Sequence, residues 1–347
     1  MLLEGLHLPL TTPFYPDGRL NLRKIEHNVD RYSRTPVAGL AVLAENGDAA
    51  MLSDSETREA LAAAMSVAGE TKVMIAGVSR GSVVGTLDLA EFAASVRYDA
   101  VLVKRPAFLR EEQMRETLTF FQAIADRSSL PVILYSVPSA SLSVHAVAEL
   151  ATHSGIIGLA DQDASATRVA SILSATSKIR REATVTTVFS AVTGRMLAVK
   201  EQAGASTFVS AESLGGGVAV ATAPPKPAIK TRTKAVGFQL ICASSAGMLA
   251  GLRAGAVGAM PDFAAAAPQG CYEVYAAWKD DDQPLADEKQ ARIAPAIAKV
   301  ESELGVPGIR FGCDLNGYFG GRPRLPLLPP TEEQRREIEA VMAGIRN

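Results

Sequence analysis

Two strand-like runs of the chain end on residues that bear on its chemistry. The run PVILYS carries Tyr135 near its end, and a phenol can pass protons to and from a reacting group. The run IIGLAD ends on Ala160 and Asp161, at the point where a parallel barrel would present a reactive side chain. A methyl group offers no such chemistry, and Asp161 and Asp163 are equally well explained as loop carboxylates or helix N-caps. Tyr135 is therefore the best single candidate for a site residue.

Charged side chains follow three other runs at the same end. Lys104 ends the run DAVLVK with Arg105 beside it, Arg80 follows VMIAGV, and Glu45 follows GLAVLA. Together they could form a charge-balanced cluster that suits a polar oxo-acid ligand. Lys104 could form an imine or bind an anion there. Alternatively, its stem packs between helix and sheet while its amine reaches solvent. The residues alone leave both interpretations open.

Bulk composition narrows the class of protein. The 347 residues are 48% hydrophobic and 21% charged, which is ordinary for a protein with a large core. A net charge of −2 gives no reason to expect nucleic acid or a membrane surface as a partner, and no apolar run is long enough to span a bilayer. The three cysteines have no metal-like spacing, and no signal pattern follows Met1. We therefore expect a reduced, cytoplasmic protein.

Short motifs for a bound metal or cofactor are missing from the sequence. It contains no P-loop, HExxH or paired CxxC pattern, and no two of its four histidines are spaced to share a metal. We therefore expect chemistry without a metal or an organic cofactor.

Eight short apolar runs alternate with segments of helical periodicity. Most are apolar throughout, as strands buried on both faces should be. They are GLHLPLTTPF, GLAVLA, VMIAGV, DAVLVK, PVILYS, IIGLAD, FQLICA and VGAM. The helical segments include 21–34, 111–127, 143–153, 164–177 and one that begins with the capping box Ser53–Glu56. Eight such units predict a (β/α)8 TIM barrel. An open doubly wound sheet is the runner-up, but no Gly-rich dinucleotide turn follows the first run.

Two stretches exceed a barrel of eight units. Residues 181–236 form a long insertion between the sixth and seventh runs, and we expect it on the face opposite the active-site loops because it follows a helix. At the C-terminus, amphipathic patterns over 285–304 and 331–346 are joined by a Gly/Pro/Arg-rich connector. We predict a barrel over 1–283, interrupted by the insertion, and a C-terminal helical segment over 284–347. A surface excursion explains the insertion best, with an oligomer contact as the alternative.

As a set, the strand ends resemble those of the dihydrodipicolinate synthase and N-acetylneuraminate lyase family of class I aldolases. The likeness covers most of residues 1–180 and 236–345. Its stretches, in the family's order, are LTTPFYPDG, GLAVLAENGDAAMLSDSE, AGVSRGS, LPVILYSVP, IIGLADQD, GAVGAM and RLPLLPPT. The resemblance implies a Schiff base between a sixth-strand lysine and pyruvate or a related 2-oxo acid. It also implies a proton-relay tyrosine on the fifth strand and a Gly-Thr-Thr-Gly-Glu turn that binds the carboxylate.

Carried over residue by residue, the resemblance is partial. It assigns the proton relay to Tyr135, in a YxVP context, and it places Ala160 where the Schiff-base lysine belongs. Gly47–Asp48 keeps the end of the carboxylate turn, but the two hydroxyl residues are Glu45 and Asn46. A glutamate there repels a bound carboxylate unless it is protonated or paired.

Other family positions also differ. Ala107 and Phe108 stand where the family has a tyrosine pair after the fourth strand. The segment Ser139–Ser141 lacks the arginine that follows YxVP in dihydrodipicolinate synthases, which argues against aspartate semialdehyde as the acceptor. By analogy with the loop after the eighth strand, Met260 should line the pocket together with Phe108.

The resemblance thus predicts a lyase or aldolase-type enzyme in a form without its imine-forming lysine. Ala160 reflects a deliberate replacement or a natural loss, or else a lysine on another strand, Lys104, takes over. A non-catalytic ligand-binding or scaffolding protein that keeps the barrel is the alternative from another class. Family analogy further implies a homo-oligomer, a dimer or a tetramer.

Overall fold

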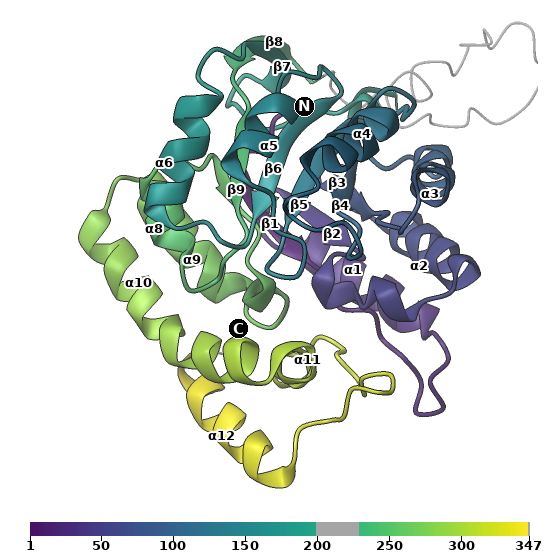
Figure 1. Ribbon diagram of the computed structural model, residues 1–347. Helices are drawn as coiled ribbons and strands as arrows, with labels where there is room; N and C mark the ends of the chain where they lie inside the picture. The colour runs from purple at the N-terminus through teal and green to yellow at the C-terminus, as the bar shows by residue number, and fades with distance from the viewer. Residues whose placement is uncertain (199–228, 346–347) are drawn as a thin grey trace, which may run out of the picture.

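Eight parallel strands form a closed barrel in the computed structural model, which describes residues 1–198 and 229–345 (Figure 1). The order around the barrel is β1-β10-β9-β6-β5-β4-β3-β2. The strands are β1 Gly5–Pro9, β2 Gly39–Val42, β3 Val73–Gly77, β4 Ala100–Lys104, β5 Val132–Ser136, β6 Ile156–Asp161, β9 Gln239–Cys242 and β10 Gly258–Ala259. Each lies in one of the eight predicted runs, so the predicted (β/α)8 barrel is confirmed and the open sheet is wrong.

The barrel closes where β1 meets β10, with Gly5 paired to Gly258. A Cβ atom at Gly258 would lie only 2.5 Å from the carbonyl oxygen of Gly5. A side chain at position 258 would therefore push the two strands apart, so this junction depends on glycine.

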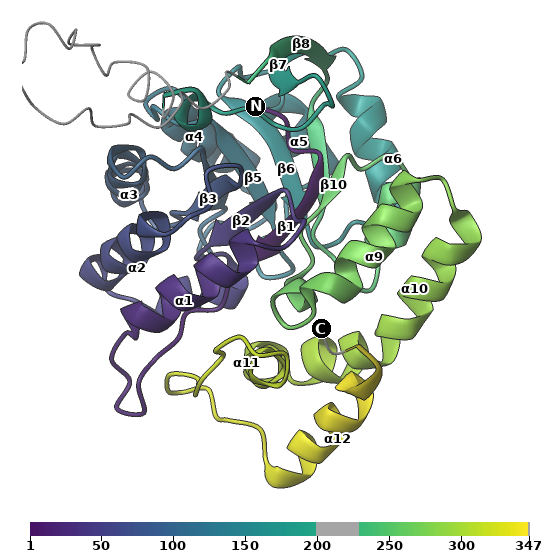
Figure 2. The same ribbon diagram turned by 180° about the vertical axis from the view of Figure 1, so that it is seen from behind.

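An outer layer of helices surrounds the barrel (Figures 1 and 2). Its members are α1 Leu22–Ser33, α2 Asp54–Ser66, α3 Val83–Ser95, α4 Met114–Ala125, α5 Val144–Leu150, α6 Ala166–Ala175, α8 Met248–Arg253 and α9 Pro268–Lys279. The predicted capping box is present at the start of α2: the Ser53 hydroxyl accepts from the Glu56 amide, and the Glu56 carboxylate accepts from the Ser53 amide.

Alternation along each strand divides the core into two parts. On β4, Val101 and Val103 belong to the cluster between sheet and helices, whereas Leu102 belongs to the cluster that fills the barrel interior. Tyr135 and Ala160 belong to the same interior cluster. The carboxyl ends of the strands therefore present one inward-facing layer of side chains at the mouth of the barrel.

A two-stranded antiparallel sheet, β7 Arg181–Thr186 and β8 Thr231–Val236, lies outside the barrel. It occupies both ends of the predicted insertion, and residues 199–228 of the insertion lie outside the described residues. Buried Leu2 packs against Ala183 and Val185, and Lys234 forms an ion pair with Glu4 at 2.8 Å. Leu2 and Glu4 lie just before β1. The two strands β7 and β8 therefore lie at the amino ends of the barrel strands, away from the mouth (Figure 1).

The C-terminal part is helical: α10 Gln283–Ala296, a π-helix over Ile297–Glu303, α11 Gly305–Leu315 and α12 Glu332–Met342 (Figure 2). The first part of the predicted connector is in fact α11. Gly305 and Pro307 are residues typical of a loop and do not predict a helix. A proline is nevertheless tolerated in the first turn of a helix, where the amide that it lacks would have no partner. The division of the chain at residue 284 stays a prediction.

Within the described ranges, no helix has the length and apolar character needed to cross a membrane.

Candidate active site

Tyr135 and Ala160 are direct neighbours across the β5–β6 ladder. Both are buried, and both face the barrel interior at the carboxyl end of their strands. Strand alternation puts them on the same face, because residues paired in register point the same way. The structure therefore brings together the two positions at which a proton-relay tyrosine and a Schiff-base lysine are expected.

The Tyr135 phenol is held in the interior by Gln162, on the loop after β6. The Gln162 side-chain amide Nε2 donates to Tyr135 Oη at 3.2 Å and to Asp262 Oδ2 at 2.8 Å. Since the phenol oxygen accepts this bond, its own proton stays available to another group. Burial, and then the nearby carboxylates of Asp262 and Glu45, raise the pKa of Tyr135 well above its usual value. The residue is therefore a phenol, a proton donor, at neutral pH.

Asp262 begins a short 3₁₀ helix, Asp262–Ala265, after β10. Burial raises the pKa of its carboxyl group well above the usual value, and the charges of Glu301 and Glu45 add to the effect. The second carboxyl oxygen, Oδ1, is buried without a hydrogen-bond partner. Burial and these neighbouring charges therefore favour the protonated form of the Asp262 carboxyl group. Sequence reasoning missed both Asp262 and Gln162, because no local pattern distinguishes them from ordinary loop residues.

Lys104 points into the mouth and forms an ion pair with Glu45. It follows Val103, which faces outward, and it pairs in register with inward-facing Tyr135. The interpretation in which Lys104 packs between helix and sheet is therefore wrong. The ion pair also reduces the expected repulsion between Glu45 and a ligand carboxylate, because the Lys104 ammonium group offsets the negative charge of Glu45.

The turn after β2 is a short 3₁₀ helix, Glu45–Gly47, pinned by its neighbours. The Asn46 side-chain amide donates to the Pro9 carbonyl at 3.2 Å and to the Asp262 carbonyl at 2.8 Å. The Thr12 hydroxyl donates to the Gly47 carbonyl at 2.7 Å. The turn is thus fixed against β1 and the loop after β10, which holds the Glu45 side chain over the mouth.

Behind this turn, Arg310 of α11 makes a buried ion pair with Asp48. Its guanidinium group also donates to the carbonyls of Gly320 and Thr12, each at 2.7 Å. Burial raises the pKa of Asp48 despite the opposing charge of Arg310. The C-terminal helices therefore anchor the mouth, a link that sequence reasoning missed because the partners are 262 residues apart.

Other predicted site residues lie apart from the ion pair of Lys104 and Glu45. Arg80 forms an ion pair with Asp54 of α2 at 2.9 Å, and the Arg105 side chain donates to the Ser141 carbonyl at 3.2 Å. Phe108 is 68% exposed on the loop after β4, whereas Met260 is buried in the interior cluster. Among the four charged residues of the expected cluster, only Glu45 and Lys104 are joined directly in the structure.

Asp161 serves the scaffold. Its carboxylate accepts from the Arg168 side chain at 2.6 Å and from the Asp163 amide at 3.2 Å, which ties the end of β6 to α6. Burial raises its pKa in spite of Arg168. Asp161 is not a helix N-cap, because the N-cap of α6 is Ser165, and its carboxylate instead links two elements of the scaffold.

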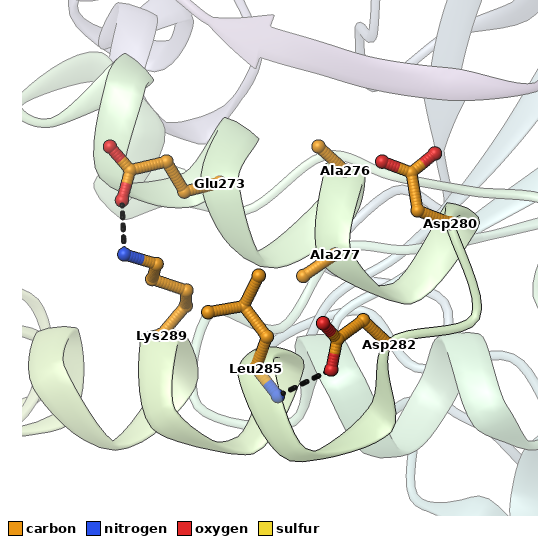
Figure 3. Close-up of a pocket in the computed structure, with 7 residues that line it drawn as sticks. All are labelled: Glu273, Ala276, Ala277, Asp280, Asp282, Leu285 and Lys289. Carbon is orange, nitrogen blue, oxygen red and sulfur yellow. Dashed lines mark hydrogen bonds and ion pairs between the residues drawn. The ribbon is translucent and has the colours of Figure 1, made fainter.

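A surface pocket between α9 and α10 lies in the outer helical layer (Figure 3). It is lined by Glu273, Ala276, Ala277, Asp280, Asp282, Leu285 and Lys289. Glu273 and Lys289 form an ion pair at 3.4 Å across it. None of these residues comes from a strand end, so the pocket is separate from the mouth. Over residues 1–198 and 229–345, no group of His, Cys, Asp or Glu side chains is arranged to hold a metal ion.

Comparisons with known proteins agree with this architecture. A model of the dihydrodipicolinate synthetase family matches residues 2–213. The chain is 25% identical to a 4-hydroxy-tetrahydrodipicolinate synthase of Acidiphilium cryptum over 347 residues, which is 99% of each chain. It is 31% identical to an L-threo-3-deoxy-hexylosonate aldolase of Hypocrea jecorina over 164 residues, 44% of this chain and 52% of that protein.

Solved structures show the same fold. A putative dihydrodipicolinate synthetase from Pseudomonas aeruginosa superposes with a TM-score of 0.78 at 19% identity, covering 99% of this chain and 100% of that one. An N-acetylneuraminate lyase from Mycoplasma synoviae gives a TM-score of 0.74 at 16% identity, covering 99% and 97%.

Proposed function

Because the chain belongs to the dihydrodipicolinate synthetase family, we propose that it is a lyase-type enzyme that takes pyruvate or a related 2-oxo acid into the mouth of its barrel, without forming an imine at position 160. The observation that carries this proposal is the in-register pair of Tyr135 and Ala160 in the barrel interior. A proton donor stands at the mouth, while the residue beside it on β6 has no nucleophile.

Tyr135 is the proton relay in this proposal. Gln162 orients the phenol and leaves its proton free, and burial keeps that proton in place at neutral pH. A ligand carbonyl or alkoxide oxygen that comes within hydrogen-bond reach can receive it. Asp262 shares Gln162 with Tyr135, and because its pKa is raised it is a second group that can hold a proton next to the phenol.

The ion pair of Glu45 and Lys104 is consistent with the binding of an acidic ligand at the mouth. Alone, Glu45 would oppose a carboxylate, but with Lys104 beside it the mouth carries no net negative charge from this pair. The ammonium group can also contact the ligand carboxylate, since both side chains keep some exposure to solvent, 30% for Lys104 and 35% for Glu45.

The test is pyruvate binding, measured by calorimetry or ligand-observed NMR, with lactate as the control that lacks the 2-oxo group. We expect the unaltered protein to prefer pyruvate, and Tyr135→Phe to bind it roughly 2- to 10-fold more weakly, through the loss of one hydrogen bond.

In parallel, Ala160→Lys restores an amine beside Tyr135, and we expect borohydride to trap pyruvate at position 160, as located by peptide mass mapping. Absence of pyruvate binding in the unaltered protein, together with no adduct in folded Ala160→Lys, contradicts the proposal. Binding without turnover in either form would instead identify a ligand-binding protein.

We also propose a homo-oligomer, a dimer or tetramer, in a reducing cytoplasm. All three cysteines, Cys242, Cys271 and Cys313, are buried and free. Burial raises the pKa of Cys242 and Cys313 to about 12, so neither is a reactive thiolate at neutral pH. Light scattering on the purified protein tests the assembly, and a monomer at micromolar concentration would contradict it.

A further inference from the structure

We propose that Lys104 is the imine-forming amine of this chain, so that the nucleophile absent from β6 is supplied by β4. The inference rests on the proposed function, because it requires a 2-oxo acid at the mouth. It concerns the chain's own amine and not the family position on the sixth strand, which is Ala160.

Register places Lys104 as close to Tyr135 as position 160 is. Tyr135 pairs with Ala160 on one side and with Lys104 on the other. Neighbouring strands are about 4.8 Å apart, so the two positions flank the phenol at similar distances. A ligand carbonyl that reaches the Tyr135 hydroxyl from the barrel axis is therefore within range of an amine on β4.

Lys104 is also the one lysine in a barrel strand among residues 1–198 and 229–345. Its backbone amide donates to the Ser79 hydroxyl at 2.9 Å, which fixes the end of β4. Lys72 shows the contrast: it precedes β3 at the amino end of the barrel, and its ammonium group donates to the carbonyls of Thr35 at 2.6 Å and Val37 at 2.7 Å. That lysine is tied to the backbone, whereas the partner of Lys104 is a base.

The base is Glu45, whose carboxylate contacts the Lys104 ammonium group. Imine formation needs a neutral amine, and the carboxylate can take one proton from it. The amine nitrogen then bonds to C2 of the 2-oxo acid while the carbonyl electron pair moves to oxygen. With proton transfers through Glu45 and Tyr135, the carbinolamine hydroxyl leaves as water. In sum, one ammonium and one ketone give one iminium ion and one water molecule.

The experiment is borohydride trapping on the full chain with pyruvate, followed by intact-mass and peptide-mass analysis. Pyruvate is the probe because every 2-oxo acid shares its reacting group. We expect a reduced pyruvyl group on Lys104 in the unaltered protein. Lys104→Arg keeps the positive charge beside Glu45 but cannot form the imine, so the adduct should be lost. Lys178→Arg, a change at an exposed lysine after α6, is the matched control and should label fully.

A second variant separates catalysis from simple ion pairing. Glu45→Gln keeps the shape of the side chain but removes the base, and trapping should slow by roughly 100-fold or more. Labelling that survives Lys104→Arg, or no labelling of a protein that binds pyruvate, overturns the inference and leaves the proposed function standing. A protein that neither binds pyruvate nor labels defeats both.

Discussion

Replacing Arg310 tests whether the C-terminal helices hold the mouth together. Arg310 has 0% exposure, and its guanidinium group serves Asp48 and the carbonyls of Gly320 and Thr12. Arg310→Met keeps much of the volume but leaves the Asp48 carboxylate buried without its cation. Breaking a buried pair from one side costs about 3–5 kcal/mol of the free energy of unfolding.

Urea unfolding, followed by circular dichroism, measures this cost. The matched control is Arg34→Met, whose side chain is 75% exposed and pairs with Asp30 along α1. A surface pair of this kind contributes less than about 1 kcal/mol. The double variant with Asp48→Asn and Arg310→Met should recover part of the loss, since it removes the unpaired buried charge.

Arg310→Met should also hold the turn Glu45–Gly47 less firmly in place. We expect a higher KM or weaker pyruvate binding as a result. Equal destabilisation by Arg310→Met and Arg34→Met would refute the reasoning. The reasoning would also be refuted if adding Asp48→Asn to Arg310→Met lowered the free energy of unfolding further instead of restoring part of it.

Two pH-linked predictions follow from buried or paired carboxyl groups. Arg324, with the Ser53 amide helping, lowers the pKa of Glu56 to about 2, so its contribution is present above the usual pKa and is lost as pH falls toward 2. Glu56→Gln should therefore unfold about 1–3 kcal/mol more easily at pH 7, with a difference that shrinks on acidification; a pH-independent difference would contradict this. For Asp262 the sign is opposite, because burial and Glu301 raise its pKa: its contribution is full below the usual pKa and is lost as pH rises. In thermal melts, Asp262→Asn should gain stability relative to the unaltered protein as pH rises above the usual carboxyl pKa, and a pH-independent difference would contradict the raised pKa.

The barrel was predictable because its signals are local. Continuous apolar runs, helical periodicity and the Ser53 capping box each depend on a few neighbouring residues, and the pairing of Tyr135 with Ala160 follows from consecutive strands. The direction of Lys104 was not readable, because a run that is apolar throughout gives no alternation to orient its last side chain.

Longer-range contacts were also out of reach. Gln162 finds Asp262 across 100 residues, and Arg310 finds Asp48 across 262, so neither pair leaves a pattern in the sequence. The helix α11 was hidden for another reason: Gly305, Pro307 and Gly308 have low helix propensity, and packing against the barrel overrides it.

The most direct test of the account is a crystal structure of the unaltered protein soaked in pyruvate. The account predicts density for one 2-oxo acid at the barrel mouth, within hydrogen-bond reach of Tyr135 Oη and without a bond to position 160. A fully occupied ligand elsewhere, such as the pocket between α9 and α10, with the mouth of the barrel left empty, would contradict it.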